Sequence, residues 1–268
     1  MTKKQPELSG QNYLVDTHCH LDMDNYENEL AELLERAQTN KVNKIITIGI
    51  DLQSSLAAIE LAREHNYVFP TIGIHPHDVR NCTDSTYHEL QTIHDQHKDI
   101  IVGYGEIGLD YAKMYSPEKI QKEHFNRQLT LANELDLPVI IHCRDAQEDL
   151  LSILKNHVPF KQSGVIHCFS SDMDFAEKVL ELGFYISIPG IVSFKNAKDL
   201  HEIAANIPLE KMLLETDAPF LAPTPFRGKR NEPSYLIYTA EHIAQLRGTT
   251  IDKIAKITSQ NAETLFNI

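Results

Sequence analysis

The stretch Lys44-Ile-Ile-Thr-Ile-Gly-Ile50 says the most about the fold of this chain. A strand with one face in water alternates polar and apolar residues, whereas this stretch is almost continuously apolar, as in a parallel sheet buried on both faces. Parallel strands need long crossover connections, which are usually helices. Amphipathic segments at 27–39 and 52–65 flank the stretch. We therefore predict a strand at about 44–50 within a parallel sheet that helices cover.

The same alternation continues along the whole chain. The other strands are predicted at about 13–18, 67–74, 100–107, 138–143, 163–168, 184–188 and 211–217. The later helices are predicted at 84–97, 117–136, 145–157, 172–182, 195–206 and 232–247, with a last one at about 250–266. Eight strands, each followed by a helix, are typical of a (β/α)8 or TIM barrel, and 268 residues suit one such domain.

We therefore predict an α/β protein with a single TIM-barrel domain over residues 1–268 and an extra C-terminal helix packed on the outside. An open doubly wound sheet fits the alternation too. That fold usually has fewer strands and a glycine-rich phosphate turn near its start, which this sequence lacks.

The segment 117–136 shows the clearest helix signals. Ser116 is a predicted N-cap, Pro117 suits the first turn and Glu118 favours the positive end of the helix.

Charge and composition exclude several classes of protein. There are 25 Lys and Arg against 38 Asp and Glu, a net charge of -13, so broad nonspecific affinity for a polyanion is not expected. Any nucleic-acid substrate would have to be gripped locally. No apolar run approaches the length of about 18 residues that spans a membrane, and no secretory apolar region follows Met1. We expect a soluble, cytoplasmic protein that does not act at a membrane, and no obligate protein partner is evident.

The four cysteines, Cys19, Cys82, Cys143 and Cys168, have no CxxC spacing. Disulfides and a zinc ribbon are therefore not expected. Three of the cysteines directly follow a histidine, so they are predicted to face outward beneath the helices as small buried side chains.

Ionisable residues follow most of the predicted strands, at the end of a barrel where active sites lie. His18 and His20 are two residues apart, so on a strand they project to the same face. The later strand ends contribute His75, Glu106, His142, His167 and Asp217. Buried imidazoles and carboxylates are costly without a cation, and imidazole suits several divalent metals. The pattern therefore predicts a metal centre.

The predicted ligands are too many for one catalytic zinc, which keeps about three protein ligands and an open position. They suit two metals that activate a water molecule for hydrolysis. Glu106, between the two histidine groups, is the candidate bridge, and Asp217 can bind one metal and also take a proton from the water. Arg144 lies two residues beyond His142 and offers a planar fork to a phosphate, although a surface ion pair explains it equally well.

Several motifs in order along the chain resemble the TatD family of metal-dependent deoxyribonucleases. They are Asp16-Thr-His-Cys-His, Gly73-Ile-His-Pro, Gly105-Glu-Ile-Gly-Leu-Asp-Tyr, Leu137-Pro-Val-Ile-Ile-His-Cys-Arg-Asp-Ala, Ile166-His-Cys-Phe-Ser, Leu214-Glu-Thr-Asp-Ala-Pro and Arg227-Gly-Lys-Arg-Asn-Glu-Pro. The resemblance implies a TIM barrel of the amidohydrolase-like superfamily. It also implies a divalent-metal-dependent hydrolase that removes nucleotides from the 3′ end of DNA. We expect that the substrate is a single-stranded 3′ end.

The resemblance also implies a distribution of ligands. One divalent metal is held by His18, His20 and Asp217. The second is held by His142 and His167, with Glu106 between the two. His75 matches a family histidine near the substrate phosphate. The metals are not identified by these residues, which suit Mg, Mn, Zn, Ni or Co. Ser171 stands where the family usually has glycine, beside His167.

The loop after the last predicted strand carries three cations, Arg227, Lys229 and Arg230, on the expected catalytic face. Barrel phosphate sites often use this region, so these residues are predicted to bind the DNA backbone. Tyr111 and Tyr115, after the fourth strand, are candidates for stacking on a base, although packing or plain exposure also explains them.

Two alternatives remain open. One is an amidohydrolase or phosphotriesterase-like enzyme that acts on a small molecule through the same ligands. The other is a metal-stabilised binding protein without catalysis. The basic loop and the family motifs favour a phosphodiester substrate.

Overall fold

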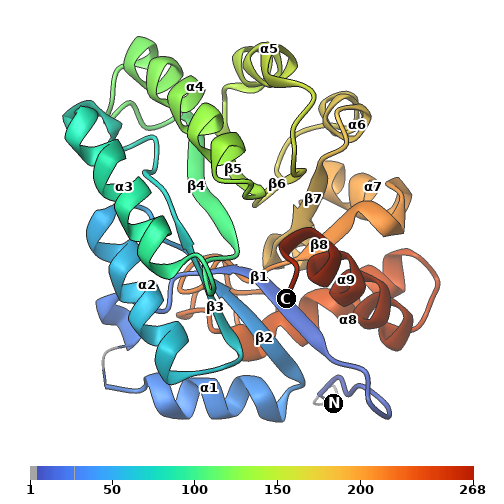
Figure 1. Cartoon of the computed structure of the whole chain (residues 1–268). Helices are drawn as coiled ribbons and strands as arrows, with labels where there is room; N and C mark the ends of the chain where they lie inside the picture. Colours follow the sequence, from blue (N-terminus) through green and yellow to red (C-terminus); the bar gives the residue numbers. More distant parts are fainter. Residues whose placement is uncertain (1–4, 27) are drawn as a thin grey trace.

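A closed ring of parallel strands is the centre of the computed structural model, which describes residues 5–26 and 28–268. Over those residues the sheet has eight strands in the order of the chain, each parallel to its neighbour. Helices surround it (Figure 1). The strands are β1 Leu14–Cys19, β2 Val42–Thr47, β3 Val68–Ile72, β4 Gly103–Asp110, β5 Val139–Arg144, β6 Gly164–Ile166, β7 Tyr185–Ile188 and β8 Met212–Leu214. The predicted TIM barrel is confirmed.

A helix follows each strand, as the alternation predicts. The helices are α1 Leu30–Thr39, α2 Leu52–Glu64, α3 Asp84–His97, α4 Glu118–Glu134, α5 Gln147–His157, α6 Met173–Glu181, α7 Lys198–Asn206, α8 Leu236–Leu246 and α9 Ile251–Phe266. The helix expected from residue 27 begins at Leu30, and residue 27 itself lies outside the described residues, as do residues 1–4.

The extra C-terminal helix α9 does more than lie on the outside. One core cluster joins side chains from β1, β2, β5, β6 and β8 to Ala262, Leu265 and Phe266 of α9. Side chains from strands on different sides of a barrel can meet only in its interior, so α9 closes one end of the barrel. The predicted metal ligands follow the strands at the opposite end.

The barrel closes between β1 and the segment that follows β8. The backbone N–H of Asp217 donates to the carbonyl of His18 at 2.9 Å, and that of His20 donates to Ala218 at 2.8 Å. Below them the buried carboxylate of Asp16 accepts from the backbone N–H and the hydroxyl of Thr216, at 2.9 and 2.6 Å. Closure therefore brings His18, His20 and Asp217 to one place.

One local prediction is wrong. Ser116 does not cap α4, because Pro117 occupies the N-cap position and no side chain caps the helix there. The Ser116 hydroxyl instead donates to the carbonyl of His77 and accepts from the backbone N–H of Arg80. It thus ties the β4–α4 loop to the segment after β3, a tertiary contact that a local capping rule does not consider.

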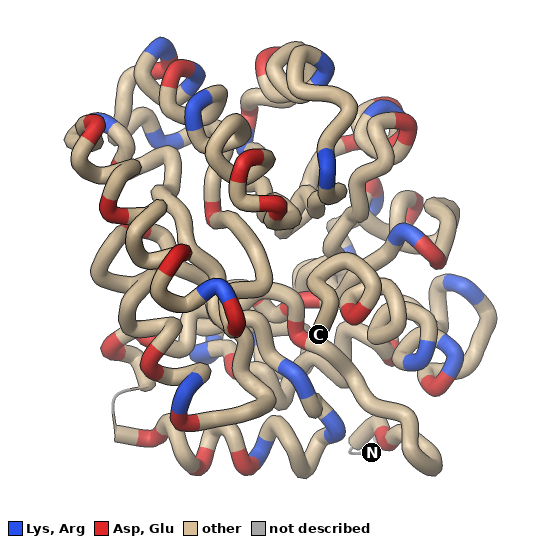
Figure 2. The backbone as a smooth tube through the Cα atoms, viewed as in Figure 1, with Lys and Arg blue, Asp and Glu red and all other residues tan. Residues whose placement is uncertain are grey.

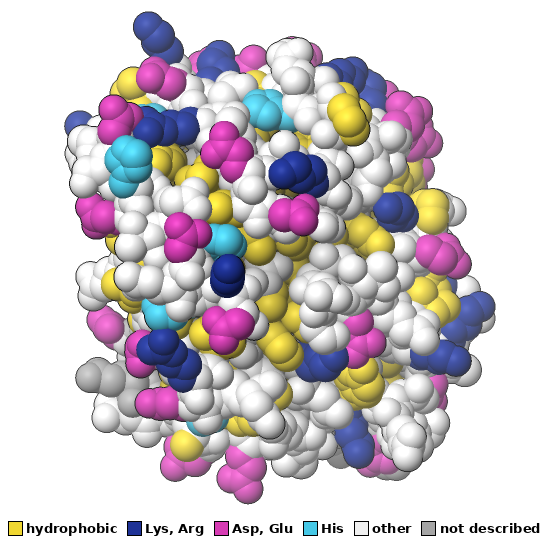
Figure 3. Space-filling model, in the orientation of Figure 1, with side chains coloured by type: hydrophobic (Ala, Val, Ile, Leu, Met, Phe, Trp, Pro, Cys, Tyr) yellow, Lys and Arg dark blue, Asp and Glu magenta, His cyan; other side chains and the backbone are white. Residues whose placement is uncertain are grey.

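Charges of both signs are interspersed over the outer helices (Figure 2), and the face in Figure 3 shows the same mixture. Over the described residues, none of the helices is long and apolar enough to cross a membrane.

The bond between Thr216 and Asp16 is expected to contribute to closure. Thr216→Val keeps the shape of the side chain and removes its donor, so we expect a loss of about 1 to 3 kcal/mol in the free energy of unfolding. Urea denaturation measures it. Thr264→Val on exposed α9 surface is the matched control, with an expected change within about 0.5 kcal/mol. Equal effects of the two substitutions would contradict this role.

Candidate metal centre

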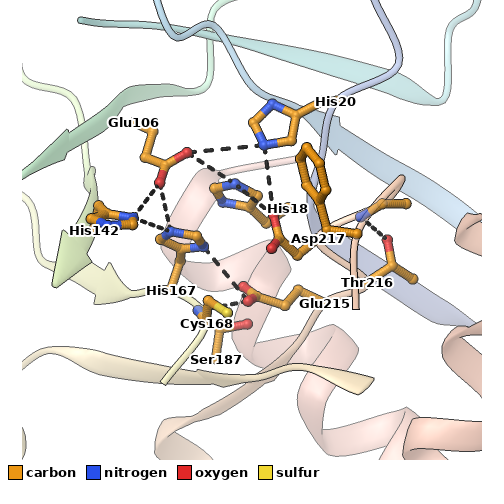
Figure 4. Close-up of polar contacts among 12 residues, drawn as sticks. His18, His20, Glu106, His142, His167, Cys168, Ser187, Glu215, Thr216 and Asp217 are labelled. Carbon is orange, nitrogen blue, oxygen red and sulfur yellow. Dashed lines mark hydrogen bonds and ion pairs between the residues drawn. The ribbon is translucent and has the colours of Figure 1, made fainter. Parts of the chain in front are cut away.

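A cavity of about 620 Å³ lies at the carboxyl ends of the strands. Its lining includes His20, His75, Glu106, Arg144, His142, His167 and Asp217 from the predicted set. His18 is fully buried beside them. The residues expected to hold metals are thus brought together from β1, β4, β5 and the segments after β6 and β8 (Figure 4).

Glu106 lies between two pairs of histidines. Its Oε1 is 2.8 Å from Nδ1 of His142 and 2.7 Å from Nε2 of His167. Its Oε2 is 3.3 Å from Nε2 of His18 and 4.0 Å from Nε2 of His20. Each carboxylate oxygen therefore faces a different pair, which is the arrangement that a bridging carboxylate requires (Figure 4).

Asp217 completes the first group of side chains. Its Oδ1 is 3.6 Å from Nε2 of His20 and 3.8 Å from Nε2 of His18. One ligand atom from each of the three residues falls within 4.8 Å of the other two. Asp217 has a φ of 54°, an unusual conformation for a residue other than glycine and one that is often found at functional sites.

A glycine in β4 explains how Glu106 reaches His142. Gly108 pairs with His142 of β5 and has a φ of 144°. A Cβ at this position would lie 2.0 Å from the carbonyl oxygen of His142, so only glycine lets the two strands approach this closely.

Asp110, at the end of β4, is a functional candidate that the sequence analysis did not assign. Its Oδ2 is 3.1 Å from Nε2 of His142 and 3.0 Å from Nε2 of His77, and its Oδ1 accepts from the backbone N–H of Lys113. A neutral His142 that donates from Nε2 carries its lone pair on Nδ1, which faces Glu106. Carboxylates orient metal-binding histidines in this way. The period of two along β4 was the available signal, because it places Asp110 on the same face as Glu106.

Glu215 stands behind His167 in a similar position. It is fully buried, its Oε1 lies 3.6 Å from Nδ1 of His167, and it accepts from the backbone N–H of Cys168 at 2.6 Å. Glu215 belongs to the motif Leu214-Glu-Thr-Asp-Ala-Pro, and no role was predicted for it.

His75 is suited to donate a hydrogen bond. Its Nδ1 accepts from the backbone N–H of His77 at 3.1 Å, so the proton of a neutral ring belongs on Nε2. Nε2 lies 3.4 Å from Oε1 of Glu106. His75 thus offers a donor to the cavity, in keeping with the expected position near a phosphate.

The charges at the site stabilise one another. Burial by itself would raise the pKa of Glu106, but His167 and His75 hold it well below its usual range. Burial lowers the pKa of His18, so its ring favours the neutral form that can bind a metal. Burial would also lower the pKa of His167, yet the carboxylates of Glu106 and Glu215 raise it well above its usual value.

Orphaned nitrogens show that these residues fit metal ions. Among the described residues, neither ring nitrogen of buried His18 has a hydrogen-bond partner, and Nδ1 of His20 has none. A buried polar atom without a partner costs about 1 to 3 kcal/mol. A divalent cation would give Nε2 of His18 a partner. It would also lie between the negative Glu106 carboxylate and the histidine lone pairs that face it, so that both would contact a positive charge.

The predicted cationic residues are not all at the cavity. Arg144 lines it, whereas Arg227, Lys229 and Arg230 are absent from its described lining. Arg230 pairs with Glu29 at 2.6 Å, and Arg227 lies over the ring of Phe194. Lys229 lies over the ring of Phe226 at 5.8 Å.

The two tyrosines after β4 differ as well. Tyr115 lines the cavity, and the Tyr111 hydroxyl donates to Asp149.

The prediction for the cysteines is wrong in part. The four cysteines, all within the described residues, are free thiols, and Cys19 is buried as expected. Cys143 and Cys168, however, line the cavity. At Cys168 the alternation of faces no longer applies, because β6 ends at Ile166 and Cys168 has a φ of 46°. Cys143 lies within β5, one residue before its end at Arg144. Ser171 has no positive φ, so its backbone does not require the glycine that the family usually has.

Comparisons with known proteins agree with this geometry. The profile of the family described as TatD related DNase matches residues 15–267. A Bacillus subtilis protein named uncharacterized metal-dependent hydrolase YabD is 44% identical over 255 residues, which cover 95% of this chain and 99% of that protein. A protein of Erwinia amylovora named 3′-5′ ssDNA/RNA exonuclease TatD is 34% identical over 261 residues, which cover 95% of this chain and 100% of that protein.

A solved structure gives the same result. The crystal structure of YjjV, a TatD homolog from Escherichia coli K12, superposes with a TM-score of 0.92 at 31% identity, over 97% of this chain and 100% of that one. The family profile and the relatives cover nearly the whole length of the chain. The chain therefore belongs to the family of TatD related DNases.

Proposed function

We propose that this protein is a divalent-metal-dependent phosphodiesterase that removes nucleotides from the 3′ end of single-stranded DNA. The observation that carries the proposal is Glu106, whose two oxygens face two separate pairs of histidines. The names of relatives support the reaction class: one is called a metal-dependent hydrolase and another a 3′-5′ ssDNA/RNA exonuclease.

The ligands divide into two groups in this proposal. His18, His20 and Asp217 would hold one cation, His142 and His167 would hold the other, and Glu106 would contribute to both. When bound, two such cations lower the pKa of an attacking water and offset the negative charge that develops on phosphate oxygens.

The protein's own side chains then have separate tasks. Burial would raise the pKa of Asp217, but its bond to His20 and the charge of His18 lower it, so its carboxylate is ionised and can accept a proton from the attacking water. His75 donates from Nε2 to a phosphate oxygen. Arg144, exposed on the rim of the cavity, offers two parallel donors to a phosphate.

The size of the cavity and the charge of the chain favour a strand end as the substrate. About 620 Å³ falls within the range of roughly 300 to 1,000 Å³ for small-ligand sites, so the cavity admits about one nucleotide. The net charge of -13 opposes binding along a long polyanion. Local cations at the mouth are consistent with contact at one or a few phosphates.

The reaction is tested with 5′-labelled single-stranded DNA, protein purified without chelator and added Mg²⁺ or Mn²⁺. We expect a ladder that shortens from the 3′ end and disappears with EDTA. Glu106→Gln should reduce kcat/KM by roughly 100-fold or more, because the charge between the two ligand groups is lost. Glu177→Gln on exposed α6 is the control. A protein with two bound metals that leaves DNA intact would contradict the proposal and favour a small ester or amide.

Asp110 is expected to act through His142. The Asp110 carboxylate accepts hydrogen bonds from both His77 and His142. The amide of Asp110→Asn can instead point an N–H donor at one of these rings. The orientation of His142 and the position of its proton are then no longer fixed. We expect metal affinity to fall roughly 10- to 100-fold. Isothermal titration of the metal-free protein with Mn²⁺ or Zn²⁺ measures it. Unchanged affinity would remove Asp110 from the site.

Arg144 is expected to contact substrate. Arg144→Gln should raise KM about 10-fold or more, since a hydrogen bond to a charged group is lost, and kcat should change less. Arg63→Gln is the control, an exposed arginine on α2 that pairs with Glu60. Arg230→Gln should have a smaller effect than Arg144→Gln, because Arg230 is held by Glu29. An Arg144→Gln enzyme with the KM of the control would rule out this contact.

A further inference from the structure

Exposed apolar side chains gather at the mouth of the catalytic cavity. Over the described residues, the large apolar side chains exposed to solvent are Leu56, Met114, Tyr115, Val158, Phe220 and Leu221. Three of them, Tyr115, Phe220 and Leu221, line this one cavity. Scattered apolar side chains are normal on a protein surface, whereas a group of them beside a functional site indicates a ligand.

Tyr115 and Phe220 come from opposite walls of the barrel. Tyr115 follows β4 and Phe220 follows β8, and strands four places apart in a closed ring of eight stand across from each other. Tyr115 is 57% exposed and Phe220 is 49% exposed, so each ring has a face that is free to bind. The metal-ligand residues lie between these two walls.

Each ring lies beside a histidine at the site. The Tyr115 ring lies edge-on to His77, with centroids 4.8 Å apart, and His77 bonds to Asp110. The Phe220 ring is 6.2 Å from the ring of His20.

The backbone of Phe220 is held as well. Its N–H donates to the carbonyl of Asp217 at 2.8 Å, and its carbonyl accepts from the side chain of buried Asn231 at 2.6 Å. These bonds fix the place of the Cα from which the ring projects, so the loop loses less conformational entropy when a ligand stacks on the ring.

Cations beside these rings identify the kind of ligand. Lys113 and Arg144 line the same cavity, so an anion and a flat apolar group can bind there together. A nucleotide has both parts, and bases of every kind stack on aromatic side chains. We propose that Tyr115 and Phe220 form a subsite for the unpaired base at the 3′ end of the strand, next to the phosphate that is cleaved. This inference rests on the proposed function and adds a reason for a preference for single strands. A base in a terminal pair has its inner face stacked on the next pair, so it cannot lie between two rings.

The test compares two single-stranded DNA substrates, one with a normal 3′-terminal nucleotide and one whose terminal nucleotide lacks its base. For the wild-type protein we expect kcat/KM to be roughly 5- to 150-fold higher on the strand with the base. Tyr115→Leu, Phe220→Leu and the double substitution should bring this ratio toward one, mainly through KM. Tyr115→Phe keeps the ring and should restore the ratio that Tyr115→Leu loses.

The control is Leu56→Ala, which removes another exposed apolar side chain, from α2 and outside the lining of this cavity. It should leave the ratio unchanged. A double variant that keeps the wild-type ratio and KM would overturn the subsite, even if the enzyme degrades DNA as proposed.

A second measurement does not depend on turnover. A strand with 2-aminopurine at its 3′ end and slowly hydrolysed phosphorothioate linkages loses fluorescence when its terminal base stacks. We expect quenching by the wild-type protein and little by the double variant. Quenching without cleavage of any nucleic acid would contradict the proposed function and leave the subsite standing. Absence of quenching by a protein that binds the strand would overturn the subsite.

Discussion

The buried carboxylate of Glu106 is the group on which the arrangement of the site depends. An ionised carboxylate in the interior is costly unless positive or donor groups surround it. Here five histidines lie around it at 2.7 to 4.0 Å: His142, His167 and His75 face Oε1, and His18 and His20 face Oε2. In the absence of a metal, protons on some of those rings balance the charge of the carboxylate. Metal cations can replace these protons, because the ring nitrogens that would bind them already face the carboxylate.

Two carboxylates behind the histidines orient the histidine rings. Asp110 and Glu215 lie on the far sides of His142 and His167, so each ring has a carboxylate on one side and Glu106 on the other. His75 differs, because its Nδ1 is occupied by a backbone N–H and its remaining nitrogen donates. Histidines that all follow strand ends in the sequence therefore differ in the fold: some present a lone pair to the cavity, and His75 presents an N–H donor.

The distribution of charge and apolar surface bears on the kind of substrate. The chain is acidic overall, and charges of both signs are mixed over the outer helices (Figure 2). At the cavity, two cations, Lys113 and Arg144, lie with exposed Tyr115 and Phe220 around the metal ligands. These contacts suit the nucleotide end of the proposed function, and the net negative charge of the chain opposes extended binding to a polyanion.

The sequence by itself determined the order of the elements and the end of the barrel at which the predicted ligands gather, because a period of two along each strand and the carboxyl-end rule for barrels are local or topological. His18, His20, His142 and Glu106 could be selected in this way. Only the tertiary structure decided the partners of those ligands. Contacts between segments distant in the chain fixed the details of the site. Asp110 bonds to two histidines, and Ser116 bonds to His77 instead of capping α4. Arg230 pairs with Glu29, and Phe220 comes from the wall opposite Tyr115. Such contacts depend on how the barrel closes and how its loops fold over it, and no local pattern in the sequence records them.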